Sequence, residues 1–420
     1  MSEAGYTDHK KHILLIAYVF PPYYGIGGRR WAKHAIALTR LGYTIHVICA
    51  ENPFPKKSLW WDTVKCNPSI ILYQLPARYP GVLLRSAHTF SQKIRYKFWD
   101  TLIRLFTKGT PYDRTAFWKN SMLRAAKKII ATHDINQVIC TGGPFGVMYH
   151  ATLLKAWKPD LFILNDLRDP WTWGPNWGFP ALNPKRMAEE KKMECAAIRD
   201  SDVFTVPNEV MYNYLISHYP QFKNKIRTIP HFFDPSEIPV KPKTPSPIIR
   251  LVLYGTIYEG IGHYLEQSAV FFAAHQNTFS LDIYTDNQQH AALFQKYGAH
   301  NVKFHNQLPA VDLFNRFDQY DFVLLYTPEY GKDNISTKFF EIIHSRTPVI
   351  FFSSKGKASD FMEVNHLGIH VDSSTFEEKL LSLANGTTSF RYNNAYDISD
   401  FSIEKIAENI SHLLENPLAL

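Results

Sequence analysis

Short apolar segments recur along the whole chain and alternate with helix-length amphipathic segments. The apolar segments are rich in Val, Ile and Tyr and lack regular polar positions, which is typical of strands buried on both faces of a parallel sheet. We predict strands at 12–20, 44–50, 69–75, 137–143, 161–167, 203–207 and 225–231, and then at 249–255, 280–285, 302–306, 322–327, 348–354 and 368–371. The segment 31–42 between the first two predicts a helix with Gly42 beyond its last turn.

The two series of strands are separated by a proline-rich segment. Five prolines fall within residues 235–247, a composition typical of a semi-rigid linker. Two β/α/β domains therefore follow, and we expect them to face each other across a cleft, because parallel sheets bind ligands at the carboxyl ends of their strands. We place an N-terminal domain at 1–236, the linker at 237–248, a C-terminal domain at 249–400 and, at 401–420, a terminal helix that returns to the N-terminal domain.

The composition is that of a folded enzyme. The chain has 420 residues, of which 45% are hydrophobic and 20% charged, and this balance excludes a disordered chain or a coiled coil. The longest apolar run, 12–20, is too short to span a membrane. The four cysteines show no metal-binding spacing, so we expect a reduced, cytoplasmic protein without a Cys-ligated zinc.

The net charge of +8 is concentrated in one segment, 93–128, which carries ten basic and two acidic residues. Aromatic side chains are interleaved with the cations, among them Trp99, Phe106, Phe117 and Trp118. This composition is typical of helices that lie on an anionic membrane surface, here the inner face of the plasma membrane. The alternative is a solvated face whose aromatic residues belong to the core. We expect no nucleic acid as a partner, because no recognised reading motif accompanies the charge.

Glycine-bearing turns follow several predicted strands. Gly27 and Gly28 precede a helix, where bare backbone N–H groups suit an anion, although an ordinary tight turn would look the same. Arg30 stands at the last position of the dinucleotide fingerprint, which disfavours a nicotinamide cofactor. Gly255 and Gly260 have P-loop spacing but lack the Lys-Ser/Thr that a Walker site requires.

The segment 334–350 predicts a helix with one narrow polar stripe. The stripe consists of Asn334, Lys338, Glu341 and Ser345, at spacings of four, three and four, and the intervening residues are apolar. Lys338 lies in the first turn, where the helix dipole disfavours a cation, and a bound phosphate would remove this conflict. The alternative is a Lys338–Glu341 pair on a solvated face.

A second candidate segment, DLRDPW at 166–171, follows a predicted strand. Its carboxylates can accept hydrogen bonds from sugar hydroxyls, and Trp171, with Trp173 and Trp177 beyond it, can present flat apolar faces to sugar rings. The alternative is an internal Arg168–Asp169 pair with the tryptophans in the core.

Several ordered segments resemble the GT-B glycosyltransferases of the large retaining family four. They are FPPYYGIGGRRWAKHAIALTRLGYTIHVI near the start, DLRDPW, KIRTIPHFFDP at 225–235, LVLYGTIYEG at 251–260 and NISTKFFEIIHSRTPVI at 334–350. The resemblance covers nearly the whole chain and implies two Rossmann-like domains. It places Glu341 on the nucleotide ribose, Lys338 near the diphosphate, and Asp333 where the family has the first acid of a pair.

The resemblance, together with the motifs above, assigns the site residues. Donor-binding residues are Gly27, Gly28, Arg29, Gly255, Thr256, Asp333, Ser336, Thr337, Lys338 and Glu341; acceptor-binding residues are Asp166, Arg168, Asp169 and Trp171; catalytic residues are Lys338, Glu341 and Asp169. We expect no cofactor and no metal, and we interpret Asp200-Ser201-Asp202 as a cap and turn.

Two departures from the family pattern bear on these assignments. The Arg and Lys that often follow the first strand of the second domain are missing after Gly255, so Lys338, Lys332, Arg29 or Arg30 would have to replace them. In the family, the turn after the fourth strand often holds a histidine, whereas this chain has Gly142 and Gly143 there. We expect the nearby His150 to point into the core.

The function implied by this resemblance is transfer of a sugar from a nucleotide-diphosphate sugar to a glycan or lipid-linked acceptor. Anomeric configuration would be retained, and cell-surface polysaccharide or lipopolysaccharide assembly is the expected context. The alternatives are a sugar-nucleotide epimerase or hydrolase of the same fold and a non-catalytic nucleotide-sugar-binding protein.

Overall fold

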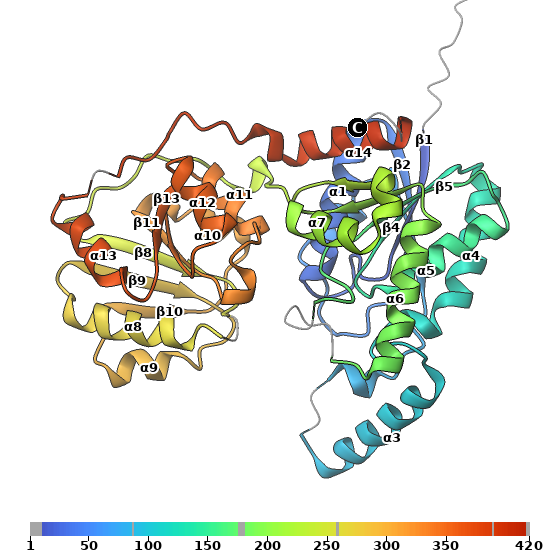
Figure 1. The fold of residues 1–420 in the computed structure, drawn as a ribbon, viewed down its shortest axis with the longest axis horizontal. Coiled ribbons are helices and arrows are strands. Elements are labelled where there is room, and N and C mark those ends of the chain that lie inside the picture. Colours follow the sequence, from blue (N-terminus) through green and yellow to red (C-terminus); the bar gives the residue numbers. More distant parts are fainter. Residues whose placement is uncertain (1–10, 86–87, 175–180, 258–259, 389, 417–420) are drawn as a thin grey trace, which may run out of the picture. The chain divides into compact units, whose positions relative to one another are not determined.

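The computed structural model describes residues 11–85, 88–174, 181–257, 260–388 and 390–416. These residues form two compact units, each built on one sheet of parallel strands with helices on its faces (Figure 1). The first unit extends to Pro230 and includes the residues from Glu404 onward, and the second unit extends from His231 to Ile403. Both units have the Rossmann-like α/β architecture that the strand pattern predicts.

The sheet of the first unit has seven strands in the order β3-β2-β1-β4-β5-β6-β7. The strands are β1 (Lys11–Ala17), β2 (Tyr43–Ala50), β3 (Ile70–Leu75), β4 (Gln137–Thr141), β5 (Phe162–Asp166), β6 (Val203–Val206) and β7 (Ile226–Thr228). All eight residues of β2 are buried, as expected for a strand covered on both faces.

Eight α-helices in the described residues belong to this first unit. They are α1 (Arg29–Arg40), α2 (Trp61–Lys65), α3 (Phe90–Phe106), α4 (Lys119–His133), α5 (Gly146–Thr152), α6 (Pro184–Arg199), α7 (Glu209–His218) and α14 (Ile403–Glu415). Their starts follow local chemistry: the Asn183 side chain accepts from the Arg186 backbone N–H to cap α6, and Pro184 occupies the first helical position. Helices α4 to α7 pack on one face of the sheet through a continuous apolar core.

The sheet of the second unit has six strands in the order β10-β9-β8-β11-β12-β13. They are β8 (Ile249–Tyr254), β9 (Phe279–Tyr284), β10 (Val302–His305), β11 (Phe322–Tyr326), β12 (Val349–Phe352) and β13 (Gly368–Val371). The helices are α8 (Gly262–Ala274), α9 (Ala291–Lys296), α10 (Ala310–Phe314), α11 (Thr337–His344), α12 (Lys357–Val364) and α13 (Phe376–Ala384). One core cluster includes α8, α9 and α13, and a second includes α10, α11 and α12.

All predicted strands are present, but several end earlier than the apolar pattern suggests. The first was predicted to extend to residue 20, whereas β1 ends at Ala17, although Tyr18 and Phe20 are fully buried. The apolar pattern reports burial, and burial continues beyond the strand where the chain turns into a packed loop. The helix predicted at 31–42 is α1, and Gly42 beyond it has φ +87°, as a helix-ending glycine requires.

Each sheet contains one point at which the strand order reverses. In the first unit this point lies between β1 and β4, and in the second it lies between β8 and β11. Consecutive segments leave such a pair of strands in opposite directions, which opens a crevice at the carboxyl ends. The glycine turns after residues 17, 141 and 254 all start at these strand ends.

The basic segment forms α3 and α4, and the two helices differ in burial. Trp118, which precedes α4, is fully buried with Met122, so for this residue the alternative interpretation, an aromatic side chain of the core, is confirmed. Its ring fills the core against Tyr18, at a centroid separation of 5.2 Å. In α3, all of which the structure describes, Ile103 is the only buried residue. Among the described helices, none is long and apolar enough to cross a membrane.

Candidate functional site

In the second unit, the first turn of α11 lies against the end of β8. The ammonium of Lys338 donates to the carbonyl of Tyr254 at 3.0 Å and lies 5.5 Å from the centroid of the Tyr254 ring. Gly255 follows with φ +89°, and a Cβ there would be 2.6 Å from Nζ of Lys338. The backbone conformation therefore favours glycine at this position, and any other residue would also require the Lys338 side chain to move.

The surroundings of Lys338 disfavour its positive charge, which a nearby anion would stabilise. Burial lowers the pKa of its ammonium to about 8, and the charge of Glu341 opposes this shift. The group remains largely protonated at pH 7, although it lies at the helix end where the dipole disfavours a cation. That a phosphate bound at this helix start stabilises the charge stays a prediction.

Glu341 lies one turn further along α11 and is only 5% exposed. Its neighbours Phe339, Phe340, Ile342 and Ile343 are buried in the core beside α12. Ser345, the last residue of the predicted stripe, is 4% exposed and donates to the carbonyl of Ile342. The alternative of a Lys338–Glu341 pair on a solvated face is therefore wrong, because Glu341 is buried.

The remaining donor-binding candidates of the second unit lie in the loops before α11 and after β8. Asp333 accepts from the backbone N–H of Lys357 at 2.9 Å and so caps the start of α12. Ser336 is the residue before α11, and its carbonyl accepts from the N–H of Phe339. Thr337 is half-buried and Thr256 is exposed. Lys332, a possible replacement for the missing cations, pairs with Glu329.

In the first unit, Arg168 ties together the loops that follow β1 and β5. Its Nη1 donates to the carbonyl of Gly27 at 2.8 Å, and its Nη2 pairs with Asp169 at 2.8 Å. A Cβ on Gly143, after β4, would lie 3.5 Å from the same guanidinium. The structure therefore gathers Gly27, Arg168 and Asp169 at one edge of the sheet. The Arg168–Asp169 pair of the alternative interpretation is present, but both side chains are partly exposed and the pair is not internal.

Gly28 is the residue before α1, and Arg29 is the first residue of this helix. Gly28 is buried, and a Cβ there would lie 3.3 Å from Cα of Phe20 and from the carbonyl of Val19. This packing explains the glycine as part of a tight turn. Arg29 lies over the ring of Trp60, with its guanidinium carbon 5.9 Å from the centroid.

Asp166 and Trp171 are buried, so neither lies where an acceptor could contact it. Asp166 is 1% exposed, and its carboxylate accepts from Trp31 at 2.7 Å and from the Thr205 hydroxyl at 2.9 Å. Burial alone would raise the pKa of Asp166, but the Arg30 guanidinium and these hydrogen bonds outweigh it and lower the pKa. This ion pair also buries Arg30. Both acceptor assignments are corrected to internal supports for the loops above them.

Trp171 is supported by a buried acid that the sequence analysis missed. Its indole N–H donates to Glu190 of α6 at 2.7 Å, and the other Glu190 oxygen accepts from the N–H of Thr110. Four residues later, Glu194 accepts from Thr172 and Tyr219 at 2.8 Å. The spacing of four places both acids on one helix face, and the buried Ala197 continues that face.

Burial raises the pKa of Glu190 to about 7, which makes the stability of the protein dependent on pH. Protonated Glu190 stabilises the folded state fully below pH 4.5. This stabilisation is lost as pH rises towards 7, because the carboxyl group of Glu190 ionises in the unfolded chain before it does so in the folded one. The pKa difference corresponds to about 3 kcal/mol. We expect the melting temperature of Glu190→Gln, relative to wild type, to rise between pH 5 and pH 8, about the window set by these pKa values. Parallel curves in calorimetry would contradict this.

Two further sequence interpretations are confirmed. Asp200 is the C-cap residue of α6. Asp202 accepts from the N–H of Ile163 at 2.8 Å and pairs with Lys155. These contacts fit the cap-and-turn interpretation of the Asp-Ser-Asp sequence. His150 is buried on α5, and burial lowers the pKa of its imidazole to about 4. Trp177 lies outside the described residues.

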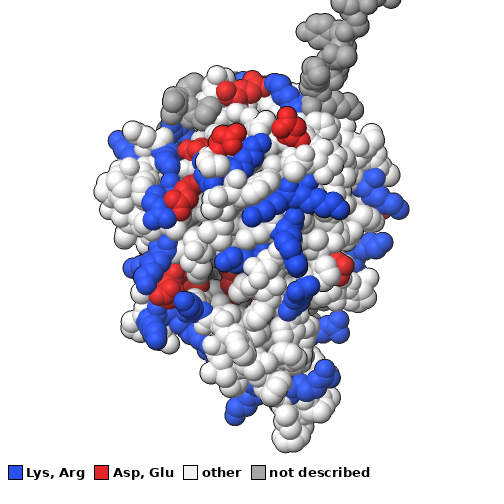
Figure 2. Space-filling view, turned by 90° about the vertical axis from the view of Figure 1, so that its right-hand side faces the viewer, with Lys and Arg blue, Asp and Glu red and all other residues white. Residues whose placement is uncertain are grey.

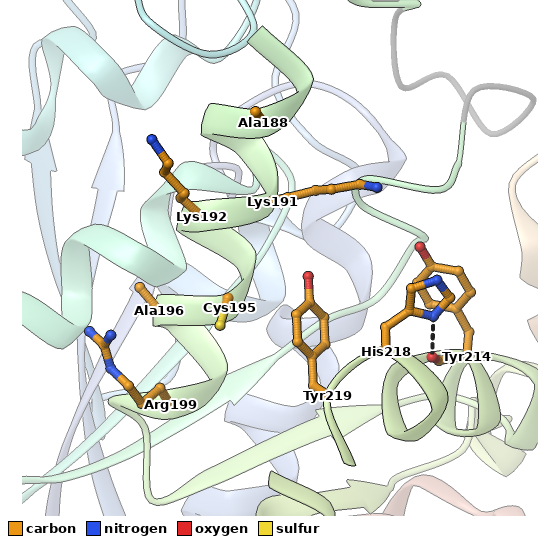
Figure 3. A pocket seen from close by; sticks show the side chains of 9 residues that line it. All are labelled: Ala188, Lys191, Lys192, Cys195, Ala196, Arg199, Tyr214, His218 and Tyr219. Carbon is orange, nitrogen blue, oxygen red and sulfur yellow. Dashed lines mark hydrogen bonds between the residues drawn. The ribbon is translucent and has the colours of Figure 1, made fainter. Parts of the chain in front are cut away.

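A pocket of about 540 Å³ lies elsewhere in the first unit, between α6 and the end of α7. Figure 3 shows side chains of α6 on one side and the rings of Tyr214, His218 and Tyr219 on the other. Cations line it, including Lys191 and Arg199, but none of the predicted site residues does. We therefore assign this pocket no part in the candidate site.

Comparisons with known proteins identify the fold. No protein-family model and no curated protein sequence matches the chain. Among solved structures, a glycosyltransferase from Rickettsia africae has a TM-score of 0.65 at 12% identity, covering 98% of this chain and 99% of that one. Sucrose-phosphate synthase from Thermosynechococcus elongatus has a TM-score of 0.63 at 13% identity, with coverages of 97% and 99%. The UDP-GlcNAc 2-epimerase of Neisseria meningitidis, bound to UDP-GlcNAc, has a TM-score of 0.53 at 12% identity, with coverages of 96% and 99%.

The chain thus has the GT-B architecture of two Rossmann-like domains. Glycosyltransferases and a sugar-nucleotide epimerase share it, so the fold leaves more than one reaction open.

Proposed function

We propose that the protein is a retaining, metal-independent glycosyltransferase of the family-four type that uses a nucleotide-diphosphate sugar as donor. The observation that carries the proposal is the ammonium of Lys338, which lies at the start of α11 and against Gly255 at the end of β8. This is the crevice at which a doubly wound sheet binds ligands. Departure of a nucleoside diphosphate requires stabilisation of negative charge, and a cation beside a helix N-terminus supplies it without a metal.

The position of Lys338 also accounts for the cations missing after Gly255. An Arg or Lys side chain in that loop would bring its charge to the end of β8, and Lys338 brings an ammonium to the same place from α11. Of the other candidates, Arg30 is buried against Asp166, Lys332 pairs with Glu329, and Arg29 lies over the ring of Trp60. We therefore assign the diphosphate to Lys338 and the backbone N–H groups at 336–338, and the ribose to Glu341.

In the first unit, we assign acceptor binding to Arg168 and Asp169. Their side chains are 26% and 42% exposed, in contrast to those of Asp166 and Trp171. The carboxylate of Asp169 is held by the Arg168 guanidinium and can still accept from a sugar hydroxyl, because each carboxylate oxygen has two lone pairs.

Helix α3 supports the proposal that the acceptor is lipid-linked and is bound at the cytoplasmic face of a membrane. Phe90, Ile94 and Phe98, at spacings of four, form an exposed apolar line that Leu105 and Phe106 continue. Exposed cations flank it, among them Lys93, Arg95 and Lys97. The lowest part of the face in Figure 2, where α3 lies in Figure 1, is white and blue. An apolar line flanked by cations is typical of helices at anionic interfaces.

We expect the protein to sediment with vesicles of phosphatidylcholine and phosphatidylglycerol and to be released at high salt. Each cation near the surface contributes on the order of 1 kcal/mol, and salt screens this attraction. Lys93→Glu with Lys97→Glu should abolish binding, whereas the matched pair Lys191→Glu with Lys223→Glu, elsewhere on the same unit, should retain it. Equal binding to vesicles without phosphatidylglycerol would contradict the assignment.

An epimerase is the second candidate, because the comparison includes an epimerase of the same fold. Thermal-shift measurements with UDP-, GDP- and dTDP-sugars test donor binding, which both enzymes share. We expect one nucleotide to raise the melting temperature of wild type and of Lys332→Ala, and to have a much smaller effect on Glu341→Gln. The absence of any shift would contradict both candidates. If a shift is observed, the reaction itself distinguishes them.

A further inference from the structure

Three histidines from separate elements of the first unit lie together, away from the candidate site. His12 is the second residue of β1, His46 is in the middle of β2, and His133 is the last residue of α4. A ring nitrogen of each lies within 4.8 Å of the others. Nδ1 of His12 lies 2.9 Å from Nε2 of His46, and the ring centroids of His46 and His133 are 4.2 Å apart.

The register of the sheet explains why these side chains meet. His46 is the partner of Leu14 across the parallel pair β1–β2, so both point to the same face. His12 precedes Leu14 by two residues and therefore shares that face. Helix α4 covers it through Met122, Ala126 and Ile129 in the core cluster that contains Leu14. The same helix ends at His133, which completes the group. The candidate site lies at the opposite, carboxyl end of β1.

Histidine is a common ligand of zinc, because a neutral imidazole has one nitrogen lone pair available for the metal.

A residue on the next strand orients the central ligand. Tyr73 of β3 places its hydroxyl 3.2 Å from Nδ1 of His46. If Nδ1–H donates to this oxygen, the lone pair of Nε2 points towards His12. Such a hydrogen bond to the second nitrogen is the usual way in which a metal-binding histidine is held in one tautomer.

We propose that His12, His46 and His133 bind one zinc ion. Tetrahedral zinc with Zn–N bonds of about 2.0–2.1 Å requires ligand nitrogens about 3.3 Å apart. The nitrogens of His12 and His46 are 2.9 Å apart and the three ligand atoms lie within 4.8 Å of one another, so zinc binding requires the side chains to rotate until the nitrogens surround the ion. His12 and His133 are half-buried, which leaves a side open for water as the fourth ligand. The ion links β1, β2 and α4 and stabilises the folded first unit.

The test uses the full-length protein without an affinity tag. We expect calorimetry with zinc chloride at pH 7.5 to give one ion per chain, the melting temperature to rise with zinc, and cobalt(II) to give the visible absorption of a tetrahedral site. His12→Ala and His133→Ala, at half-buried positions, should each abolish the cobalt spectrum. Tyr73→Phe should keep the stoichiometry and weaken affinity by about 10- to 100-fold. His412→Ala, an exposed histidine on α14, is the matched control and should bind as wild type does.

Two results would overturn the proposal. One is a folded wild-type protein that binds zinc only at millimolar concentration, which would leave the three residues as a hydrogen-bonded histidine cluster. The other is an unchanged cobalt spectrum in folded His12→Ala and His133→Ala, which would place the ion elsewhere.

Discussion

Replacing Lys338 by alanine is expected to lower the rate of nucleoside diphosphate release about 100- to 1000-fold, the usual effect of removing one group that stabilises a developing oxyanion. Donor affinity should change much less, because the charge on the leaving diphosphate grows in the transition state. Steady-state kinetics combined with calorimetric donor binding separates the two effects. The pKa of about 8 adds a second signature: in wild type the rate should fall as the pH rises above this value and the ammonium deprotonates.

Lys332→Ala is the matched control for this prediction. It removes a cation six residues away that pairs with Glu329, and we expect nearly unchanged turnover. A folded Lys338→Ala protein with full turnover, or with a loss confined to donor affinity, would contradict the role of Lys338.

Glu341→Gln is expected to weaken binding of the nucleotide by about 1.5–3 kcal/mol, or roughly 10- to 150-fold in Kd, because a buried carboxylate makes charge-assisted hydrogen bonds to ribose hydroxyls. The free nucleoside diphosphate and its sugar conjugate should be affected equally, since both contain the ribose. Glutamine keeps the size of the side chain at a position that is only 5% exposed.

The 2′-deoxy nucleotide provides the control within the same experiment. Wild type should bind it more weakly than the ribonucleotide, and the variant should no longer distinguish the two. Glu363→Ala, on α12 of the same unit, should behave as wild type. Equal discrimination in wild type and Glu341→Gln would show that another residue contacts the ribose.

The fold could be predicted well from the sequence because the two patterns used, apolar runs in strands and polar spacing on a helix, involve residues that are close together along the chain. Apolar runs without polar alternation mark doubly covered strands, and every predicted strand is present. Lys338 and Glu341 could be singled out because their spacing on one helix is fixed by 3.6 residues per turn. The pattern also showed which flanking residues of α11 are buried, since the apolar positions surround a narrow stripe.

Burial of individual polar and aromatic residues could not be predicted in the same way. Asp166 and Trp171 stand in a segment that suits sugar binding, yet their partners Trp31, Thr205 and Glu190 come from distant parts of the chain. Trp118 belongs to the core for the same reason, because Tyr18 is a hundred residues away in sequence. His12, His46 and His133 have no recognisable spacing, and only the register of β1 and β2 and the packing of α4 bring them together.

The most direct test of sugar transfer is nuclear magnetic resonance of the preferred nucleotide sugar incubated with the protein, with and without a glycolipid extract from the cells that make it. We predict that the donor is consumed rapidly only when the extract is present and that the new glycosidic bond has the anomeric configuration of the donor. Appearance of an epimerised nucleotide sugar without any acceptor would contradict the account and identify the protein as an epimerase.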